Sequence, residues 1–514
     1  MLASVFSAGI TGIDGFVVTV ECNQLMTSQN ARFDIVGLPD LAIREAKERV
    51  MSAFANSGFR FPEAKTTVNL APADRKKEGT GFDAAILTAA AVCCGALRGV
   101  DLSDKCIIGE LSLSGDVRPV NGVLCMCAAA KDAGLREVYV PVENAAEAAA
   151  VEGVTVYAVP TVKALFDHLT DRKKLTPVPS ETPFDEISQT YAEDFSDVRG
   201  QGLAKRAMEI AAAAGGHNIL LIGPPGTGKS MLAKRLPSIL PPLTFSEAIE
   251  TTKIHSVAGT LAAGQSLLLR RPFRAPHHTM SPVSLVGGGA NPMPGEVSLA
   301  HNGVLFLDEL PEFPKVVTDS LRQPLEDRKV TITRASGRLT FPCSFMLVAA
   351  MNPCRCGYFG HPTHPCTCKP GDVARYLSRV SGPLMDRIDI QIELPSLPYE
   401  TISTEDEKAE RSAVIRERVT AAREFARERM KDRPDIFCNA QLDPAGIHRY
   451  CKVDAAASAL LKTAYEKLGL SARGYDRVLR VARTIADLAK NPEIRMEHVA
   501  EAIQLRSLDR KYWK

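Results

Sequence analysis

The feature that most constrains the fold of this chain is a glycine-rich segment in its middle, Gly223-Pro-Pro-Gly-Thr-Gly-Lys229-Ser230. An apolar run, Asn218–Ile222, precedes it, and a helix-forming segment, Met231–Leu236, follows it. This spacing matches GxxxxGK[ST], the phosphate-binding loop that joins a buried strand to a helix in a parallel α/β sheet. The glycines allow backbone N–H groups and the helix N-terminus to surround a phosphate. The segment therefore predicts a nucleotide site in which Lys229 contacts the β- and γ-phosphates and the Ser230 hydroxyl binds Mg²⁺.

Two apolar strands downstream of the loop lead into polar side chains. Val304–Leu307 is followed by Asp308 and Glu309, and Phe345–Ala350 leads to Asn352. Acidic groups at the carboxyl end of a strand suit a Mg²⁺ ion and an attacking water. We expect Asp308 to hold the metal, Glu309 to polarise the water, and Asn352 to orient that water or sense the γ-phosphate. The predicted nucleotide-binding residues are Gly223, Pro224, Pro225, Gly226, Thr227, Gly228, Lys229, Ser230 and Asp308.

The length of the chain, 514 residues, exceeds a single core of about 250–300 residues and predicts several domains. Residues 1–170 mix short β-like runs with alanine-rich helical stretches, which predicts an α+β domain. Residues 171–194 contain a polar, proline-containing stretch and are the predicted linker. Residues 195–398 alternate strands, helices and glycine-rich loops, a pattern typical of a parallel sheet. Residues 399–514 are charged and show helical periodicity, which predicts a helical domain.

Composition narrows the class of protein. The net charge of +2 argues neither for nor against nucleic acid, so any basic surface must be local. The longest nearly apolar run, Ala84–Leu97, is shorter than the roughly 18–20 residues of a membrane-spanning helix. The N-terminus shows no basic segment ahead of an apolar one, and the 13 scattered cysteines suggest reduced thiols. These features predict a cytoplasmic protein with no membrane segment.

Four cysteines lie in two tight pairs, Cys354-Arg-Cys356 and Cys366-Thr-Cys368, with His361 and His364 between them. Four thiolates suit a tetrahedral structural Zn²⁺ site with no open position for catalysis. The alternative is a loop of reduced thiols without metal. We predict the zinc site at Cys354, Cys356, Cys366 and Cys368.

Taken together, these motifs resemble the Mg-chelatase-like branch of the AAA+ superfamily, and in particular the ComM/YifB family, over essentially the whole chain. Beyond the phosphate-binding loop, the resemblance is carried by Arg271–His278, Gly287–Gly289, Pro294–Leu310, Ser381–Arg387 and Val481–Leu488. It implies an AAA+ core with a C-terminal helical lid, ATP and Mg²⁺ as cofactors, and a homo-hexameric ring. It also implies that Arg387 is an arginine finger for the neighbouring subunit's nucleotide. Arg473 matches the sensor-2 arginine of the lid, with Arg477 as the alternative.

The N-terminal region resembles the Lon-protease-like fold, also called ribosomal S5 domain 2-like, through Ile107–Val120, Ala128–Gly134 and Val138–Pro141. Lon proteases use a Ser–Lys dyad, but by our alignment Gly81 stands at the serine position and Leu124 at the lysine position. Thr80 is a neighbouring hydroxyl without a positioned base. Because the nucleophile and its base are missing, we expect this domain to be proteolytically inactive and to serve assembly or DNA contact.

A basic hairpin is predicted between residues 329 and 341, just before the Phe345–Ala350 strand, where AAA+ helicases of the MCM type carry a pore-facing hairpin. Lys329, Arg334 and Arg338 are its candidate DNA contacts, because cations at such a tip follow phosphates without reading sequence. The alternative is a solvated hairpin.

A second basic stretch, residues 270–289, could also line a pore. It holds Arg270, Arg271, Arg274 and the adjacent His277 and His278. The alternative for the two histidines is metal binding, which their divergent directions disfavour.

The resemblance implies a Mg²⁺-dependent AAA+ ATPase that works as a ring-shaped motor on single-stranded or branched DNA. Helicase or branch-migration activity in recombination or natural transformation is the expected work. Two alternatives remain: the motor subunit of a magnesium chelatase, and a protein remodeller that does not act on DNA.

Overall fold

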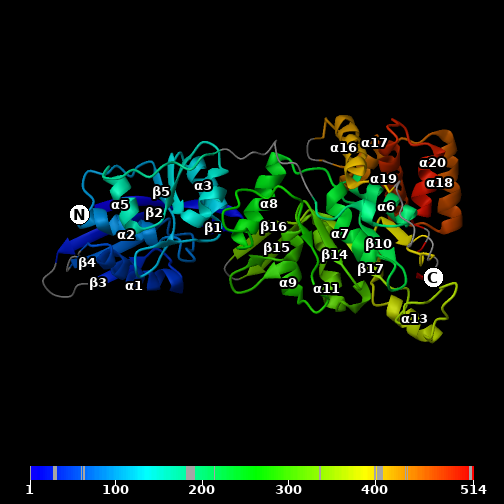
Figure 1. The fold of residues 1–514 in the computed structure, drawn as a ribbon, viewed down its shortest axis with the longest axis horizontal. Coiled ribbons are helices and arrows are strands. Elements are labelled where there is room, and N and C mark those ends of the chain that lie inside the picture. Colours follow the sequence, from blue (N-terminus) through cyan, green and yellow to red (C-terminus); the bar gives the residue numbers. More distant parts are fainter. Residues whose placement is uncertain are drawn as a thin grey trace. The chain divides into compact units, whose positions relative to one another are not determined.

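The structure is a computed structural model that describes residues 2–26, 32–59, 61, 64–180, 191–213, 215–334, 337–398, 401, 409–433, 436, 438–506, 508 and 512–513. The chain divides into two compact units (Figure 1). One contains residues 1–187 and 245–269, and the other contains residues 188–244 and 270–514. Of the predicted linker, residues 181–190 lie outside the described part of the chain.

The first unit is built on a mixed sheet with the strand order β3-β4-β2-β1-β5-β8-β9. Its strands are β1 (Leu2–Thr11), β2 (Asp14–Met26), β3 (Arg32–Val36), β4 (Ala64–Ala71), β5 (Lys105–Ile107), β8 (Glu137–Pro141) and β9 (Thr155–Val159). The β1–β2 and β2–β4 pairs are antiparallel, and the other pairs are parallel. A small hairpin joins β6 (Glu110–Leu111) to β7 (Val117–Arg118).

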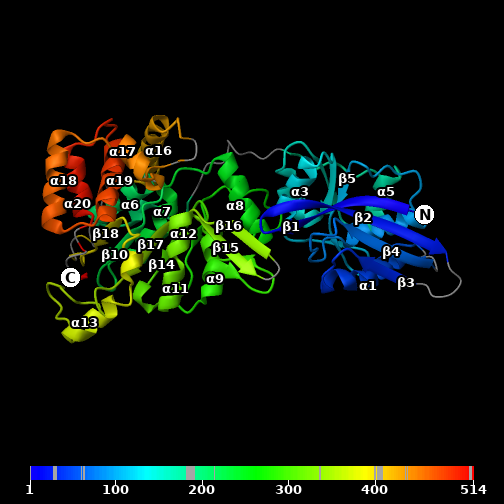
Figure 2. The ribbon, with the colours of Figure 1, turned by 180° about the vertical axis from the view of Figure 1, so that it is seen from behind.

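Helices cover this sheet, as Figure 2 shows from the opposite side. They are α1 (Leu41–Asn56), α2 (Asp83–Cys93), α3 (Val123–Asp132), α4 (Ala145–Ala149) and α5 (Val162–Leu169). Helix α2 is apolar on every side and almost completely buried, which is typical of a helix enclosed by a core. Helix α1 begins at Asp40, whose side chain accepts a hydrogen bond from the Ile43 N–H and so caps the helix.

One helix of the first unit comes from the middle of the chain. Helix α8 (Phe245–Val257) follows the phosphate-binding region in sequence but packs against α3 of the first unit. The Ser256 hydroxyl donates a hydrogen bond of 2.6 Å to the buried Glu147 carboxylate, and the Gly122 N–H donates to the Ser256 carbonyl. Leu267, farther along the same segment, is buried in the apolar cluster of that unit. Residues 245–269 are therefore part of its core.

The second unit holds a parallel sheet with the strand order β11-β14-β17-β10-β18. Its strands are β10 (Ile219–Ile222), β11 (Phe273–Arg274), β14 (Val304–Leu307), β17 (Met346–Met351) and β18 (Ile390–Glu393). Two elements precede the first of these strands, η2 (Phe195–Asp197) and α6 (Gly202–Ala213). Between the strands lie α7 (Lys229–Ile239), α9 (Pro282–Val286), α10 (Glu296–Leu299), η3 (Leu310–Glu312), α11 (Lys315–Ser320), α12 (Arg322–Asp327), α13 (Pro370–Leu377) and α14 (Gly382–Met385). The parallel sheet predicted for this region is confirmed.

The chain after the sheet is helical, as predicted. Its helices are α16 (Ser412–Arg429), α17 (Pro444–Tyr450), α18 (Ala455–Leu468), α19 (Ala472–Leu488) and α20 (Met496–Gln504). Asp487 of α19, almost fully buried, lies 2.5 Å from the Arg429 guanidinium of α16 and 2.9 Å from that of Arg483, so the buried charge is paired. Within the described residues, every helix is too short or too polar to cross a membrane.

Candidate nucleotide-binding site

The phosphate-binding loop, residues 223–230, leaves the sheet at the end of β10, between β17 and β18. Gly226 and Gly228 have φ angles of +79° and +87°, which glycine adopts without strain. At Gly223, a Cβ atom would stand only 2.6 Å from the Leu394 carbonyl oxygen. The glycines of the motif are thus required by backbone conformation and by close approach, and helix α7 begins directly after them at Lys229.

Lys229 is buried within the loop that precedes it. Its Nζ donates hydrogen bonds to the carbonyl oxygens of Gly223 (2.7 Å) and Pro224 (2.8 Å), and to Oδ1 of Asn352 (3.1 Å). Burial lowers the pKa of this ammonium group to about 8, and the carboxylates of Asp308 and Glu309 oppose that shift. The cation is therefore held inside the loop, next to the side chain that ends β17.

The acidic pair at the end of β14 stands beside the first turn of α7. The Ser230 hydroxyl donates a hydrogen bond of 2.6 Å to Oδ2 of Asp308, and the Glu309 N–H donates to Oδ1. A hydroxyl and a carboxylate are the hard oxygen ligands that Mg²⁺ prefers. The Glu309 side chain is 58% exposed, and its backbone has a φ of +52°, an uncommon conformation for a residue other than glycine.

The order of the strands explains why these residues meet. Strands β14, β17 and β10 are parallel neighbours, so their carboxyl ends lie at one edge of the sheet. Asp308, Asn352 and the phosphate-binding loop follow those three ends. A glycine-rich loop, a buried lysine, a hydroxyl paired with a carboxylate and an exposed glutamate together have the chemistry that suits ATP with Mg²⁺.

His278 is a further residue at this edge, and sequence reasoning considered it only as a pore-lining or metal-binding residue. Its Nδ1 lies 3.8 Å from Oε2 of Glu309. Strand β11 pairs in parallel with β14, so the chain beyond β11 emerges beside Asp308 and Glu309. Had the sequence shown that β11 lies next to β14, the position of His278 shortly after β11 would have indicated that it lies at this edge.

Within the described residues, neither of the two predicted arginines has a side-chain hydrogen bond or ion pair with the phosphate-binding loop of its own chain. Arg387 follows α14; it forms an ion pair with Glu326 of α12 and donates a 2.5 Å hydrogen bond to the Pro383 carbonyl. Arg473 is exposed in the first turn of α19.

Arg477, the alternative to Arg473, is buried, with its Nε 3.7 Å from the Asp389 carboxylate. Burial would raise the pKa of the Asp389 carboxyl, but the hydrogen bond from His217 and the nearby Arg480 and Arg477 outweigh it and hold that pKa well below its usual range. Arg477 therefore contributes to the paired charges around Asp389.

The four predicted cysteines come together in the loop between β17 and α13. Their sulfur atoms all lie within 4.8 Å of one another. Cys354 is buried and the other three are partly exposed. Within the described residues this is the only cluster of three or more His, Cys, Asp or Glu side chains able to share an ion. His277 and His278 are not part of such a group; their rings lie 4.1 Å apart.

The predicted basic hairpin is formed by β15 (Lys329–Arg334) and β16 (Gly337–Pro342), paired antiparallel from Lys329 opposite Pro342 to Arg334 opposite Gly337. Lys329, Arg334 and Arg338 are exposed. The turn residues 335–336 lie outside the described part of the chain. A second hairpin pairs β12 (Gly287–Gly288) with β13 (Met293–Pro294). It packs beside the first hairpin: a Cβ atom added at Gly287 would lie 3.3 Å from the Ile332 side chain.

The two positions that our alignment matched to a Ser–Lys dyad have apolar surroundings in the first unit. Leu124 is completely buried, and a Cβ at Gly81 would lie 3.8 Å from Val120. The expectation that Thr80 has no base beside it is wrong, because the Thr80 hydroxyl donates a hydrogen bond to the Glu110 carboxylate.

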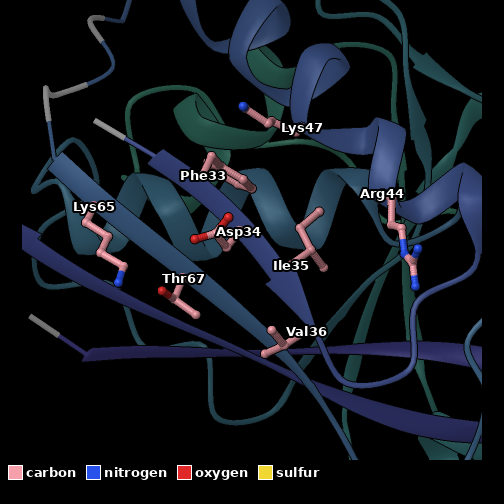
Figure 3. Close-up of a pocket in the computed structure, with 8 residues that line it drawn as sticks. All are labelled: Phe33, Asp34, Ile35, Val36, Arg44, Lys47, Lys65 and Thr67. Carbon is pink, nitrogen blue, oxygen red and sulfur yellow. The ribbon is translucent and has the colours of Figure 1, made fainter. Parts of the chain in front are cut away.

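A pocket of about 500 Å³ lies elsewhere in that unit, at the β3 edge of the sheet. Figure 3 shows Arg44 and Lys47 reaching it from α1, and Lys65 and Asp34 from the strands. Its mixed charges form no pairing of a nucleophile with a base.

Similarity to known proteins extends over almost the whole chain. The family description "Subunit ChlI of Mg-chelatase" matches residues 20–144, "Magnesium chelatase, subunit ChlI" matches residues 194–402, and the ChlI C-terminal description matches residues 409–506. The chain is 42% identical over 512 residues to competence protein ComM of Haemophilus influenzae, across 99% of this chain and 98% of that protein. It is 40% identical over 509 residues to the uncharacterized protein YifB of Escherichia coli, across 99% and 98%. A more distant similarity, 21% over 330 residues, links 59% of this chain to 34% of the zygotic DNA replication licensing factor mcm6-B of Xenopus laevis.

Proposed function

Because the chain belongs to the magnesium chelatase ChlI family and is similar over its full length to ComM and YifB, we propose that it is a Mg²⁺-dependent ATPase. In this proposal the ATPase assembles into a ring and moves DNA. The observation that carries the ATPase assignment is a pair of contacts across three strand ends. Ser230 hydrogen-bonds to Asp308, and Lys229 hydrogen-bonds to Asn352. These contacts gather a phosphate-binding cation and two metal ligands at one edge of the sheet.

The proposed roles follow from position and chemistry. ATP with Mg²⁺ supplies a phosphoryl group that water can attack. Lys229 binds its terminal phosphates, while Ser230 and Asp308 bind the metal ion. Glu309, exposed beside them, accepts a proton from the attacking water, and Asn352 orients that water. Zn²⁺ in the cysteine cluster is the proposed structural metal.

Assembly into a homo-hexameric ring gives Arg387 a role. Arg387 completes the nucleotide site of the neighbouring subunit, where a guanidinium stabilises charge that develops during phosphoryl transfer. Arg473 acts from the helical lid. Within the described residues, the Arg387 side chain pairs with Glu326 and the Pro383 carbonyl rather than with the phosphate-binding loop of its own chain, which supports a role between subunits.

DNA is the proposed substrate of the motor, in single-stranded or branched form. The exposed cations Lys329, Arg334 and Arg338 on one hairpin support contact with a phosphate backbone. The names of two relatives, a competence protein and a DNA replication licensing factor, support the same substrate. Helicase or branch-migration activity is the form of work that we propose.

A second candidate is the ATPase motor of a magnesium-chelatase-type complex, which the family descriptions themselves favour. Such a motor acts on a protein that inserts metal into a tetrapyrrole, so DNA would not change its rate. A protein remodeller would behave in the same way.

The test is the steady-state ATPase rate of the full chain with and without single-stranded and forked DNA. We expect DNA to raise the rate severalfold, and added salt to reverse the effect, because phosphate contacts weaken as salt rises. Glu309→Gln is expected to bind ATP and to lose turnover by about 100-fold or more. A rate indifferent to DNA would favour the second candidate, and normal turnover of Glu309→Gln would refute the site itself.

A further inference from the structure

We propose that the cysteine cluster binds one structural Zn²⁺ ion, and that the loop which it closes, residues 354–368, braces the phosphate-binding loop. The inference rests on ATP binding at residues 223–230, as proposed above. It gives that metal centre a role, which is to set the affinity of the nucleotide site without contacting the nucleotide.

The positions of the sulfur atoms fit a single tetrahedral ion. The Sγ of Cys354 lies 3.3 Å from that of Cys356 and 3.7 Å from that of Cys366, and the Cys356–Cys366 separation is 3.5 Å. A Zn–S bond of about 2.3 Å places tetrahedral sulfurs about 3.8 Å apart. A disulfide requires about 2.05 Å, so these sulfurs are not bonded to each other.

The histidines of the loop are engaged elsewhere. Nε2 of His361 lies 2.9 Å from the Ser396 hydroxyl, and its Nδ1 accepts hydrogen bonds from the N–H groups of Thr363 and His364. Nδ1 of His364 lies 3.2 Å from the Thr363 hydroxyl, and the group of side chains close enough to share an ion holds the four cysteines alone. Four thiolates therefore make up the whole ligand set. Such a set leaves no coordination position for a water or a substrate, which makes the ion structural.

The loop depends on this cross-link. Residues 353–369, all of them described, form neither helix nor strand, so no ladder of backbone hydrogen bonds holds them. Three of the four ligands are partly exposed rather than packed into a core. An ion that joins Cys354 and Cys356 to Cys366 and Cys368 ties the two ends of the loop together.

The ordered loop touches the nucleotide site directly. Gly357, the residue after Cys356, has a φ of +89°, and a Cβ there would lie 2.5 Å from the ring of Pro225 in the phosphate-binding loop. Only a glycine allows this approach. Cys354 also follows Asn352 by two residues, and Asn352 accepts a hydrogen bond from Lys229. The metal centre thus holds two segments that contact the phosphate-binding loop, one at Gly357 and one at Asn352.

A second contact links the metal loop to the phosphate-binding loop. Ser396, which pairs with His361, lies just after Leu394, and the Leu394 carbonyl stands where a Cβ at Gly223 would collide with it. The metal loop therefore reaches the phosphate-binding loop directly at Pro225 and indirectly at Gly223.

Two variants separate the metal from the brace. Cys366→Ser removes one ligand at the end of the loop far from Asn352, and Cys94→Ser, a partly exposed cysteine in the first unit, is its control. Gly357→Ala keeps all four ligands but pushes against Pro225. Gly371→Ala, where a Cβ meets open space, is the control for that variant. Zinc per chain is measured by elemental analysis, and nucleotide affinity by titration of a fluorescent ATP analogue.

We expect about one zinc per chain in the parent protein and in Cys94→Ser, Gly357→Ala and Gly371→Ala, and less than about 0.2 in Cys366→Ser. The affinity for the ATP analogue is expected to fall about tenfold in both Cys366→Ser and Gly357→Ala, the loss that accompanies one or two supporting contacts. Both controls are expected to bind the analogue as the parent does.

The outcomes against the proposal differ from one another. Less than about 0.2 zinc per chain in the parent protein, or iron in its place, refutes the zinc site. Parental affinity in Cys366→Ser or Gly357→Ala refutes the brace. Loss of analogue binding by the parent itself, with zinc present, refutes the nucleotide site and leaves the metal site standing. Thermal unfolding of each variant identifies a general loss of structure, in which case Gly357→Ala decides the question.

Discussion

Lys229 is a buried cation whose charge the protein compensates only in part. Three oxygen acceptors surround its Nζ, yet burial lowers its pKa from 10.5 to about 8. The negative charges of Asp308 and Glu309 oppose this shift without cancelling it. The polyphosphate of a nucleotide would favour the charged form, so nucleotide binding and protonation of Lys229 are linked.

This linkage predicts the pH dependence of nucleotide affinity. Below about pH 8 the ammonium is already charged, whereas above it the neutral amine predominates and binding must take up a proton. Affinity for an ATP analogue should therefore fall as the pH rises through 8, by up to about tenfold per pH unit. Lys229→Arg binds more weakly but stays charged, so its affinity should change little with pH. Titrations between about pH 7 and 9 measure this, and an equal slope in both proteins would contradict it.

At the scale of elements, local patterns predicted the strands and loops of the second unit. Apolar runs gave β10, β14 and β17 to within a residue or so, because each is a continuous buried strand bounded by glycine or polar residues. The phosphate-binding loop was readable since its chemistry resides in consecutive residues. The cysteine cluster was readable for the same reason.

Pairings between distant segments could not be predicted in this way. The position of His278 beside Glu309 depends on β11 lying next to β14, and nothing local in Phe273-Arg274 specifies that neighbour. Helix α8 likewise lies between two elements of the second unit in sequence, and its polar and apolar residues do not indicate which core receives it. Its partner became evident only through contacts such as that of Ser256 with Glu147.

The contact that secures α8 gives a prediction about stability. Glu147 accepts hydrogen bonds from Ser256 and from the Asn144 amide, each 2.6 Å long. Glu147→Ala leaves these buried donors without their acceptor and should lower the free energy of unfolding by about 1–3 kcal/mol. Glu147→Gln keeps an acceptor, and because burial raises the pKa of Glu147, removing its charge should cost less than the alanine change. Urea unfolding measures both, with the exposed Glu143→Ala as control; equal losses for alanine and glutamine would contradict the assignment.

At the scale of the whole molecule, the chain leaves the second unit after residue 244, contributes residues 245–269 to the core of the first unit, and returns to the second unit at residue 270. Arg271 stands where this segment returns to the second unit. Its guanidinium donates hydrogen bonds to the carbonyls of Pro241 (2.7 Å) and Pro242 (3.2 Å), just before the segment, and of Asn302 (2.8 Å). The departing and returning chains are thereby fastened together between α7, which begins at Lys229, and β11, which leads to His278.

The proposed ring predicts how the ATPase rate changes when two inactive variants are mixed. If Arg387 serves the neighbouring subunit, a complete site needs Lys229 from one chain and Arg387 from the next. Lys229→Ala and Arg387→Ala should each lose ATPase activity alone. Mixed in equal amounts, they should regain up to about a quarter of the parental rate, because about one interface in four then joins an intact loop to an intact arginine. The rates of the separate and mixed proteins measure this. Absence of any regain, with mixed rings demonstrated by differently tagged subunits, would place the action of Arg387 within its own chain.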